Sequence, residues 1–173
     1  GQAQLKAVAG EFEIDMVNAT QNGLVAVAQN AVLSIADLDA DSTSGLDIAQ
    51  AGSLKLTGEA SVAGSVKNEG TISADETLAA AGSWTGSGTI ANAKEITASD
   101  WSVANTINNA TDDSVVTFAS GTNTVGAVVG GKVAANADFS ATSLQGVKSL
   151  SVSEAVDARI DSLAADAIVN AGS

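Results

Sequence analysis

Apolar side chains recur at every sixth position through the middle of this sequence, and this spacing restricts the fold more than any other feature. The positions are Ile48, Leu54, Ala60, Val66, Ile72, Leu78, Trp84, Ile90 and Ile96. Three steps of six make eighteen, and segments one such interval apart match in detail: Gly70-Thr71-Ile72 corresponds to Gly88-Thr89-Ile90. A repeat of this length is typical of folds in which each unit packs against its neighbours.

Three rows of apolar residues extend the repeat when slips of one residue are allowed. The first row is Ile35, Leu54, Ile72, Ile90, Ile107, Val125, Leu144 and Leu163; the second is Ile48, Val66, Trp84, Trp101 and Phe118; the third is Ala60, Leu78, Ile96 and Val115. Side chains alternate between the two faces of a strand, so three short strands per turn would point these rows into a narrow lumen. The rows predict an all-β fold, a right-handed triangular β-solenoid (β-helix) with about 18 residues per coil. We expect a single domain over residues 1–173, with the less regular segments 1–30 and 130–173 as caps or joining elements.

Two alternatives to this arrangement remain open. A β-sandwich also has strands every ~8–12 residues, although it does not predict three rows at one common interval. Segment 154–170 carries apolar residues at helical spacing, including Val156, Ile160 and Leu163, and Ser153 can cap a helix. The C-terminal segment is therefore expected to be a short helix or, alternatively, a further coil or capping strand.

The composition agrees with a narrow coil and excludes several kinds of site. The chain has 17 glycines, no proline, and only two tryptophans and three phenylalanines; proline would remove hydrogen bonds from the sheet. The absence of Cys and His excludes zinc fingers, iron–sulfur clusters and Ser-His-Asp catalysis. A net charge of −13 argues against nucleic acid and anionic membranes as partners. No apolar run is long enough for a transmembrane helix, so no membrane insertion is expected.

Two matching segments resemble coils of known β-helical proteins. Asn68-Glu69-Gly70-Thr71-Ile72 and Gly86-Ser87-Gly88-Thr89-Ile90 are similar to the N-x-G-T-I and G-x-G-T-I coils of bacterial adhesins, namely autotransporter passengers and filamentous-haemagglutinin-type exoproteins. The six-residue spacing is also similar to that of bactofilins, which form filaments. The resemblance covers about residues 46–126 and implies a structural or adhesive role at a bacterial cell surface or in the extracellular space.

A hydroxyl side chain precedes most members of the first apolar row. The residues that we single out as a candidate ligand-binding ladder are Ser53, Thr71, Thr89, Thr106 and Thr124. A flat, regular hydroxyl face could bind ice or a glycan. The alternative is that these residues only stabilise the sheet, because Thr favours strands and neighbouring hydroxyls support a ladder.

Carboxylates at alternate positions form a candidate calcium site at Asp37, Asp39, Asp41 and Asp47. An EF-hand is not expected, because Ser42 stands where its loop needs glycine and Ile48 where it needs the closing glutamate. The alternative is a solvated loop without metal. For Trp84, Trp101 and Phe118 we expect stacking inside the lumen rather than a sugar-binding platform outside.

These observations favour a noncatalytic extracellular protein that assembles with itself into a fibre or layer through exposed strand edges. A glycan or another surface protein is a further expected partner. The second hypothesis is a ligand-binding module that uses the hydroxyl ladder. The third is a β-helical carbohydrate-active enzyme, although only seven Lys and Arg residues are available and nothing selects a particular pair of carboxylates.

Overall fold

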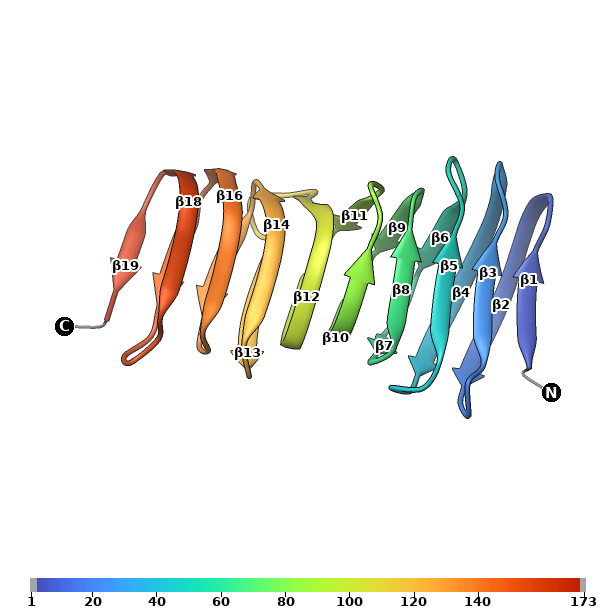
Figure 1. Ribbon diagram of the computed structural model, residues 1–173. Helices are drawn as coiled ribbons and strands as arrows, with labels where there is room; N and C mark the ends of the chain where they lie inside the picture. Colours follow the sequence, from blue (N-terminus) through green and yellow to red (C-terminus); the bar gives the residue numbers. More distant parts are fainter. Residues whose placement is uncertain (1–2, 172–173) are drawn as a thin grey trace.

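The computed structural model describes residues 3–171, in which strands and turns are wound into one long coil (Figure 1). All strand pairings are parallel, and together they make a β-solenoid of about nine turns. The near strands in Figure 1 run upward while the chain proceeds from right to left, so the coil is right-handed. Residues 3–171 contain no helix, and therefore none that is long and apolar enough to cross a membrane.

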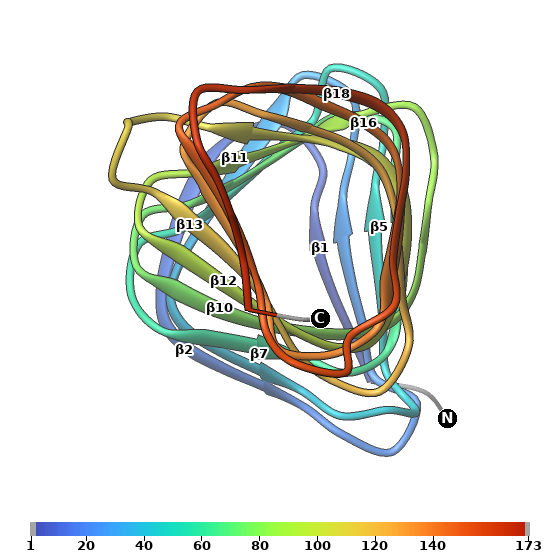
Figure 2. The same cartoon turned by 90° about the vertical axis from the view of Figure 1, so that its left-hand side faces the viewer.

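The coil has three faces, which Figure 2 shows along the axis. Face A contains the short strands β1(Gln4–Ala7), β3(Leu24–Val27), β5(Gly45–Ile48) and β8(Ser65–Asn68). Face B contains β6(Ser53–Leu56), β9(Thr71–Ala74) and β11(Thr89–Asn92). Face C contains β7(Ala60–Val62), β13(Val115–Ser120), β15(Lys132–Ala135), β17(Ser149–Val152) and β19(Ile168–Asn170). The remaining strands turn corners between faces: β2(Gly10–Ala19), β4(Ala31–Ala40), β10(Thr77–Thr85), β12(Glu95–Asn109), β14(Asn123–Val129), β16(Phe139–Val147) and β18(Ala158–Ala165).

On each face one inward-facing ladder runs the length of the coil, and the three ladders make up much of the core. The face A ladder is Leu5, Val25, Leu46, Val66, Trp84, Val103, Val125, Ala141 and Ile160. The face B ladder is Phe12, Leu33, Leu54, Ile72, Ile90, Ile107, Val128, Leu144 and Leu163. The face C ladder is Val17, Leu38, Ala60, Leu78, Ile96, Val116, Val133, Leu150 and Ile168. Because each member packs on the members above and below it, burial occurs between neighbouring coils.

The eighteen-residue period holds in the middle of the molecule but not at its ends. Leu54, Ile72 and Ile90 are in register at intervals of eighteen, as predicted. In the N-terminal coils Phe12, Leu33 and Leu54 are in register at intervals of 21, and over the whole molecule the coils lie about 19 residues apart. The all-β solenoid is therefore confirmed, with a longer and less uniform repeat than the central sequence indicates.

Several predicted row members were wrong because the corners vary in length. Leu33 precedes Leu54 in the ladder where Ile35 was expected, and Val128 follows Ile107 where Val125 was expected. On face A, Leu46, Val103 and Val125 take the places expected for Ile48, Trp101 and Phe118. On face C, Val116 takes the place expected for Val115. Extra residues at a corner shift every later position without changing the strands themselves.

The C-terminal segment is a further coil, which was one of the two alternatives expected there, and it is not the helix that was the other. Strands β18 and β19 pair in parallel with β16 and β17. Leu163 lies in register with Leu144, and Ile168 with Leu150. A helix would form hydrogen bonds only within its own backbone. A strand here also pairs with the backbone amide and carbonyl groups at the free edges of β16 and β17. The pairing with the previous coil therefore overrides the local helical spacing.

The aromatic side chains are inside the lumen, as predicted, but they form two pairs rather than one row. Trp84 and Trp101 meet edge to face with ring centroids 5.2 Å apart. Phe118 stacks on Phe139 at 4.6 Å instead of following Trp101. All four rings are buried. A bulge between Ala81 and Gly82 sets the offset between the two tryptophans.

Glycine and asparagine form the corner between faces A and B in the central coils. A Cβ on Gly88 would lie 2.2 Å from the carbonyl oxygen of Gly70, so only glycine fits there. In the next coil Asn105 is buried at this corner, and its Nδ2 donates to the carbonyl oxygens of Gly88 and Asn68 at 3.0 Å each. The side chain thus gives these carbonyl groups of the corner a further donor.

Candidate interaction surfaces

Four of the five predicted ladder hydroxyls form one outward row on face B. Ser53 is in register with Thr71, Thr71 with Thr89, and Thr89 with Thr106. All four side chains are half-buried. Neighbouring coils are spaced about 4.8 Å apart, so the row is regular along the axis. We call these four residues the face B hydroxyl row.

Thr124 does not belong to that row, and its assignment was wrong. In the next coil the residue in register with Thr106 is Ala127, whereas Thr124 lies on face A between Ser102 and Ser140. The cause is that two corners are longer in this coil: the step from Val116 on face C to Val125 on face A has nine residues, where Leu78 to Trp84 has six, and the corner between faces B and C is longer by the same amount. At the corner between faces B and C, Thr111–Ser114 form a turn in which the Ser114 amide donates to the Thr111 carbonyl at 3.2 Å. Figure 2 shows this corner protruding ahead of β13. The added residues move Thr124 onto the neighbouring face.

A second row of hydroxyl side chains was missed by the sequence analysis. Ser83, Ser102, Thr124 and Ser140 are in register on face A, and Ser140 Oγ lies 3.3 Å from Thr124 Oγ1. The intervals of 19, 22 and 16 residues follow no single period, so no fixed spacing could reveal the row. Only the corner lengths bring these side chains together.

Asp41, one of the four predicted calcium ligands, acts as a cap at a corner of the coil. Its Oδ1 accepts hydrogen bonds from the Thr43 amide at 2.9 Å, Thr43 Oγ1 at 2.8 Å and Ser44 Oγ at 2.9 Å. Its Oδ2 accepts from the Gln21 amide of the preceding coil at 3.1 Å. The hydroxyl donors Thr43 and Ser44 are the main reason that the pKa of Asp41 falls from 3.8 to about 2. This carboxylate is already engaged by protein donors.

The other three predicted ligands lie outward on two faces. Asp37 and Asp39 are exposed on face C, and Asp47 is exposed on face A. Among residues 3–171 no three Asp or Glu side chains are grouped so that they could hold a metal ion. Calcium binding stays a prediction, and melting curves recorded with and without a chelator test it.

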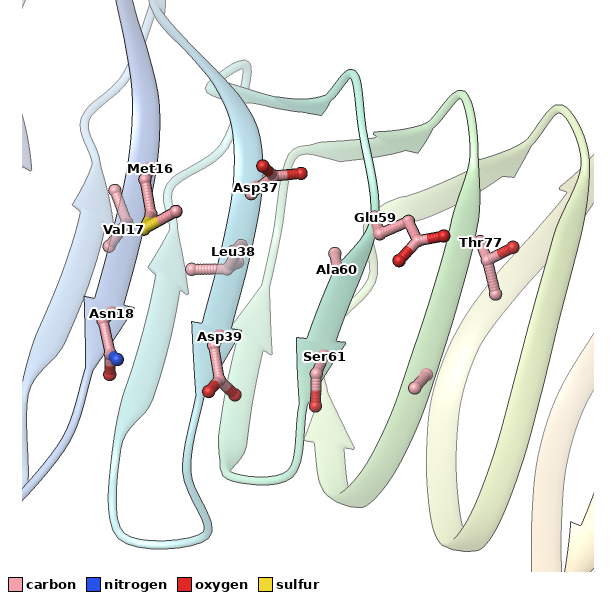
Figure 3. A pocket seen from close by; sticks show the side chains of 11 residues that line it. Met16, Val17, Asn18, Asp37, Leu38, Asp39, Glu59, Ala60, Ser61 and Thr77 are labelled. Carbon is pink, nitrogen blue, oxygen red and sulfur yellow. The ribbon is translucent and has the colours of Figure 1, made fainter.

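A shallow hollow of about 590 Å³ crosses face C near the N-terminal end (Figure 3). Its lining comes from β2, β4, β7 and β10 and includes Met16, Asp37, Asp39, Glu59 and Thr77. Figure 3 shows the three carboxylates projecting from parallel strands rather than converging on one point. The hollow follows from the pleated outer surface of four neighbouring coils.

The two ends of the coil expose apolar side chains that interior coils bury. At the N-terminal end Phe12 is 43% exposed, whereas Leu33, which follows it in the face B ladder, is 1% exposed. At the C-terminal end Leu163 is 42% exposed and Ile168 57%, whereas Leu144, which precedes Leu163 in the face B ladder, is 0% exposed. Among the described strands β1 and β2 pair only with the following coil, and β18 and β19 only with the preceding one. Each end therefore presents an unpaired strand edge beside apolar surface.

Ion pairs on the surface connect neighbouring coils. Lys94 pairs with Glu76, Lys132 Nζ lies 2.7 Å from Asp113 Oδ1, and Lys148 Nζ lies 3.2 Å from Asp166 Oδ2. In each of these pairs the partners are 18 or 19 residues apart. A charge on one coil is thus within reach of a charge at the adjacent position of the next coil.

No family model, curated protein or solved structure matches this chain.

Proposed function

We propose that this chain is a noncatalytic structural protein that assembles with itself, end to end, through the strand edges of its terminal coils. The observation that carries the proposal is the pair of strand edges at the two ends of residues 3–171, where Phe12, Leu163 and Ile168 are exposed at positions that interior coils bury. The resemblance of the central coils to bacterial adhesins supports placing the fibre or layer at a cell surface or in the extracellular space.

Exposed edges favour association because they carry unpaired amide and carbonyl groups. Proteins that remain monomeric protect such edges with charges, proline, bulges or a covering segment. In residues 3–171 no helix or loop covers β2 or β18, and the inward positions there are apolar. A second coil placed on either edge would pair the backbone and bury the apolar side chains together.

Net charge opposes the same association and makes it depend on salt. The N-terminal coil carries Lys6 with three carboxylates, and segment 154–171 carries Arg159 with four. Both ends are therefore negative. Salt screens charges over ~8 Å at 0.15 M, so raising the ionic strength from very low values should promote assembly.

A direct test compares charges placed at an end and in the middle of face B. Leu163→Lys puts a lysine on the inward ladder of the last coil, whereas Gln145→Lys puts one on an exposed, outward position of β16. Sedimentation velocity and negative-stain microscopy should show fibres or oligomers for the unmodified chain and for Gln145→Lys, and none for Leu163→Lys. Circular dichroism confirms that each variant is folded. Monomers alone for the unmodified chain, over a wide range of protein and salt concentrations, would refute the proposal.

A second candidate function, binding of ice or a glycan, is favoured by the face B hydroxyl row. Its four side chains repeat at the coil spacing, although the outward residues beside them are mixed: Lys55, Ser73, Ala91 and Asn108. Thr89→Lys would interrupt the row, and Thr77→Lys on face C is the matched control. Thermal hysteresis or glycan binding that falls only with Thr89→Lys would support this function, and an equal signal from both variants would exclude the row.

A further inference from the structure

The two ends of the coil offer different edges, and this restricts how two copies can join. Within the molecule each coil pairs through one edge with the coil before it and through the other with the coil after it. The free edge of β18 corresponds to the edge through which an interior coil pairs with the following coil. The free edge of β2 corresponds to the edge through which an interior coil pairs with the preceding coil. Only head-to-tail stacking continues the parallel ladder.

The charges on β2 disfavour the alternative head-to-head contact. Glu11, Glu13 and Asp15 are exposed on one short stretch of this strand. Two N-terminal ends brought together would place these carboxylates against the same residues of the other copy. Like charges on paired strands are destabilising, whereas head-to-tail stacking would place Glu11 and Glu13 beside the small residues Ser162 and Ala164 of β18. It leaves one pair of like charges, Asp15 beside Asp166, and Asp166 is already paired with Lys148.

We propose, on the basis of the assembly proposed above, that a second copy stacks head to tail in the same register that relates neighbouring coils within the chain. The last member of each inward ladder then packs on the first member of the same ladder in the next copy. Ile160 lies on Leu5, Leu163 on Phe12 and Ile168 on Val17. All three junctions join apolar side chains, so the cores of the two copies become continuous. Such a contact does not close on itself and produces an open, polar filament.

The same register brings two opposite charges together on face A. Lys6 follows Leu5 and Asp161 follows Ile160, so both point outward from neighbouring strands across the junction. Both side chains are exposed, and neither makes an ion pair with any residue in 3–171. Lys94 with Glu76 and Lys148 with Asp166 already join adjacent coils in this way. The Lys6–Asp161 pair therefore selects the register, while the ladders supply most of the attraction.

Cysteine cross-linking tests the polarity and register of the junction. The chain has no cysteine, so every disulfide comes from the introduced residues. Glu11→Cys and Ser162→Cys are made in separate chains, which are then mixed, because this register places Glu11 beside Ser162. The mixture should form a covalent dimer under mild oxidation, whereas Glu13→Cys mixed with Ser162→Cys should not, since the residue two positions along lies beyond the span of a disulfide. A dimer from Glu11→Cys alone would instead indicate the head-to-head contact and overturn the proposal.

A charge exchange tests the ion pair. Lys6→Glu or Asp161→Lys alone should weaken the association by about two- to fivefold, the usual effect of an exposed ion pair, and mixing the two variants should restore it across their shared junction. Lys67→Glu, in the middle of face A, is the control and should change nothing. If the unmodified chain assembles but the mixture is no stronger than either single variant, the ion pair is refuted while the assembly stands. If the unmodified chain stays monomeric, the proposed function itself fails.

Discussion

The central coils and the terminal coils are built from the same ladders but differ in how completely those ladders are enclosed. In the centre, steps of eighteen residues, glycine corners and buried asparagines produce a closely stacked coil. At the ends, the inward members Phe12, Leu163 and Ile168 are each exposed by about half. Leu144 and Leu163 are the same residue type in adjacent places of one ladder, yet their exposed fractions are 0% and 42%.

Burial of a ladder side chain therefore depends on having a neighbouring coil on both sides. The intrinsic character of the side chain does not decide it, because Leu144 and Leu163 are identical. In a solenoid each unit is stabilised by its own fold and by the interfaces to the units next to it. A terminal coil lacks one interface, and it is stabilised less for that reason.

The largest expected effect comes from truncating the two leucines. Leu144→Ala should lower the free energy of unfolding by about 2–5 kcal/mol, because it leaves a cavity between two coils. Leu163→Ala should lower it by only about 1 kcal/mol, because much of the side chain already contacts water. Urea denaturation of the dilute chain measures both. Equal losses would show that the last coil is as well supported as the interior.

The next effect concerns the corner of the central coils. Gly88→Ala should cost about 1–3 kcal/mol, since the new Cβ is forced against the Gly70 carbonyl oxygen. Gly45→Ala is the control on face A, where the nearest atom is a Leu24 side-chain carbon at 3.5 Å. That variant should be neutral or stabilised by up to about 1 kcal/mol. A Gly88→Ala chain that melts like the control would contradict the close stacking of this corner.

A smaller effect is expected from the buried asparagine of the same corner. Asn105→Ala removes a donor to the Gly88 and Asn68 carbonyl oxygens and should cost about 1–2 kcal/mol. Asn108→Ala, on an exposed outward position of the same strand, should change stability by less than about 0.5 kcal/mol. Thermal unfolding distinguishes them, and the interpretation fails if the exposed substitution is the more damaging.

The smallest effect is the pH dependence from Asp41 in the longer N-terminal coils. Its folded pKa of about 2 lies below the ordinary value of 3.8, so its contribution to stability is present above pH 3.8 and is lost as the pH falls through about 2. Asp41→Asn should therefore flatten the fall in melting temperature over this range. Thr43→Ala, which removes one donor, should give an intermediate curve. An unchanged slope for Asp41→Asn would mean that the carboxylate is not held by its corner.

Much of the architecture could be predicted from the sequence because side-chain alternation and the six-residue spacing are local properties. Leu54, Ile72 and Ile90, and the hydroxyls just before them, were placed correctly on this basis. The rows failed where corners differ in length, as between Thr106 and Ala127. A corner can gain residues without changing the pattern of either flanking strand, so a fixed period cannot follow it.

A narrow all-β coil could be predicted from the sequence, because small side chains inside, an absence of proline and a recurrent apolar position leave few other ways to bury a core. The tertiary structure decided which residues share a ladder: it moved Thr124 to face A, paired Phe118 with Phe139 and made strands of segment 158–170. It also placed Phe12 and Leu163 in the first and last of the described coils, where each has a neighbouring coil on one side only within residues 3–171. The physical reason is that register and exposure depend on the coil above and the coil below, and a single stretch of sequence contains neither.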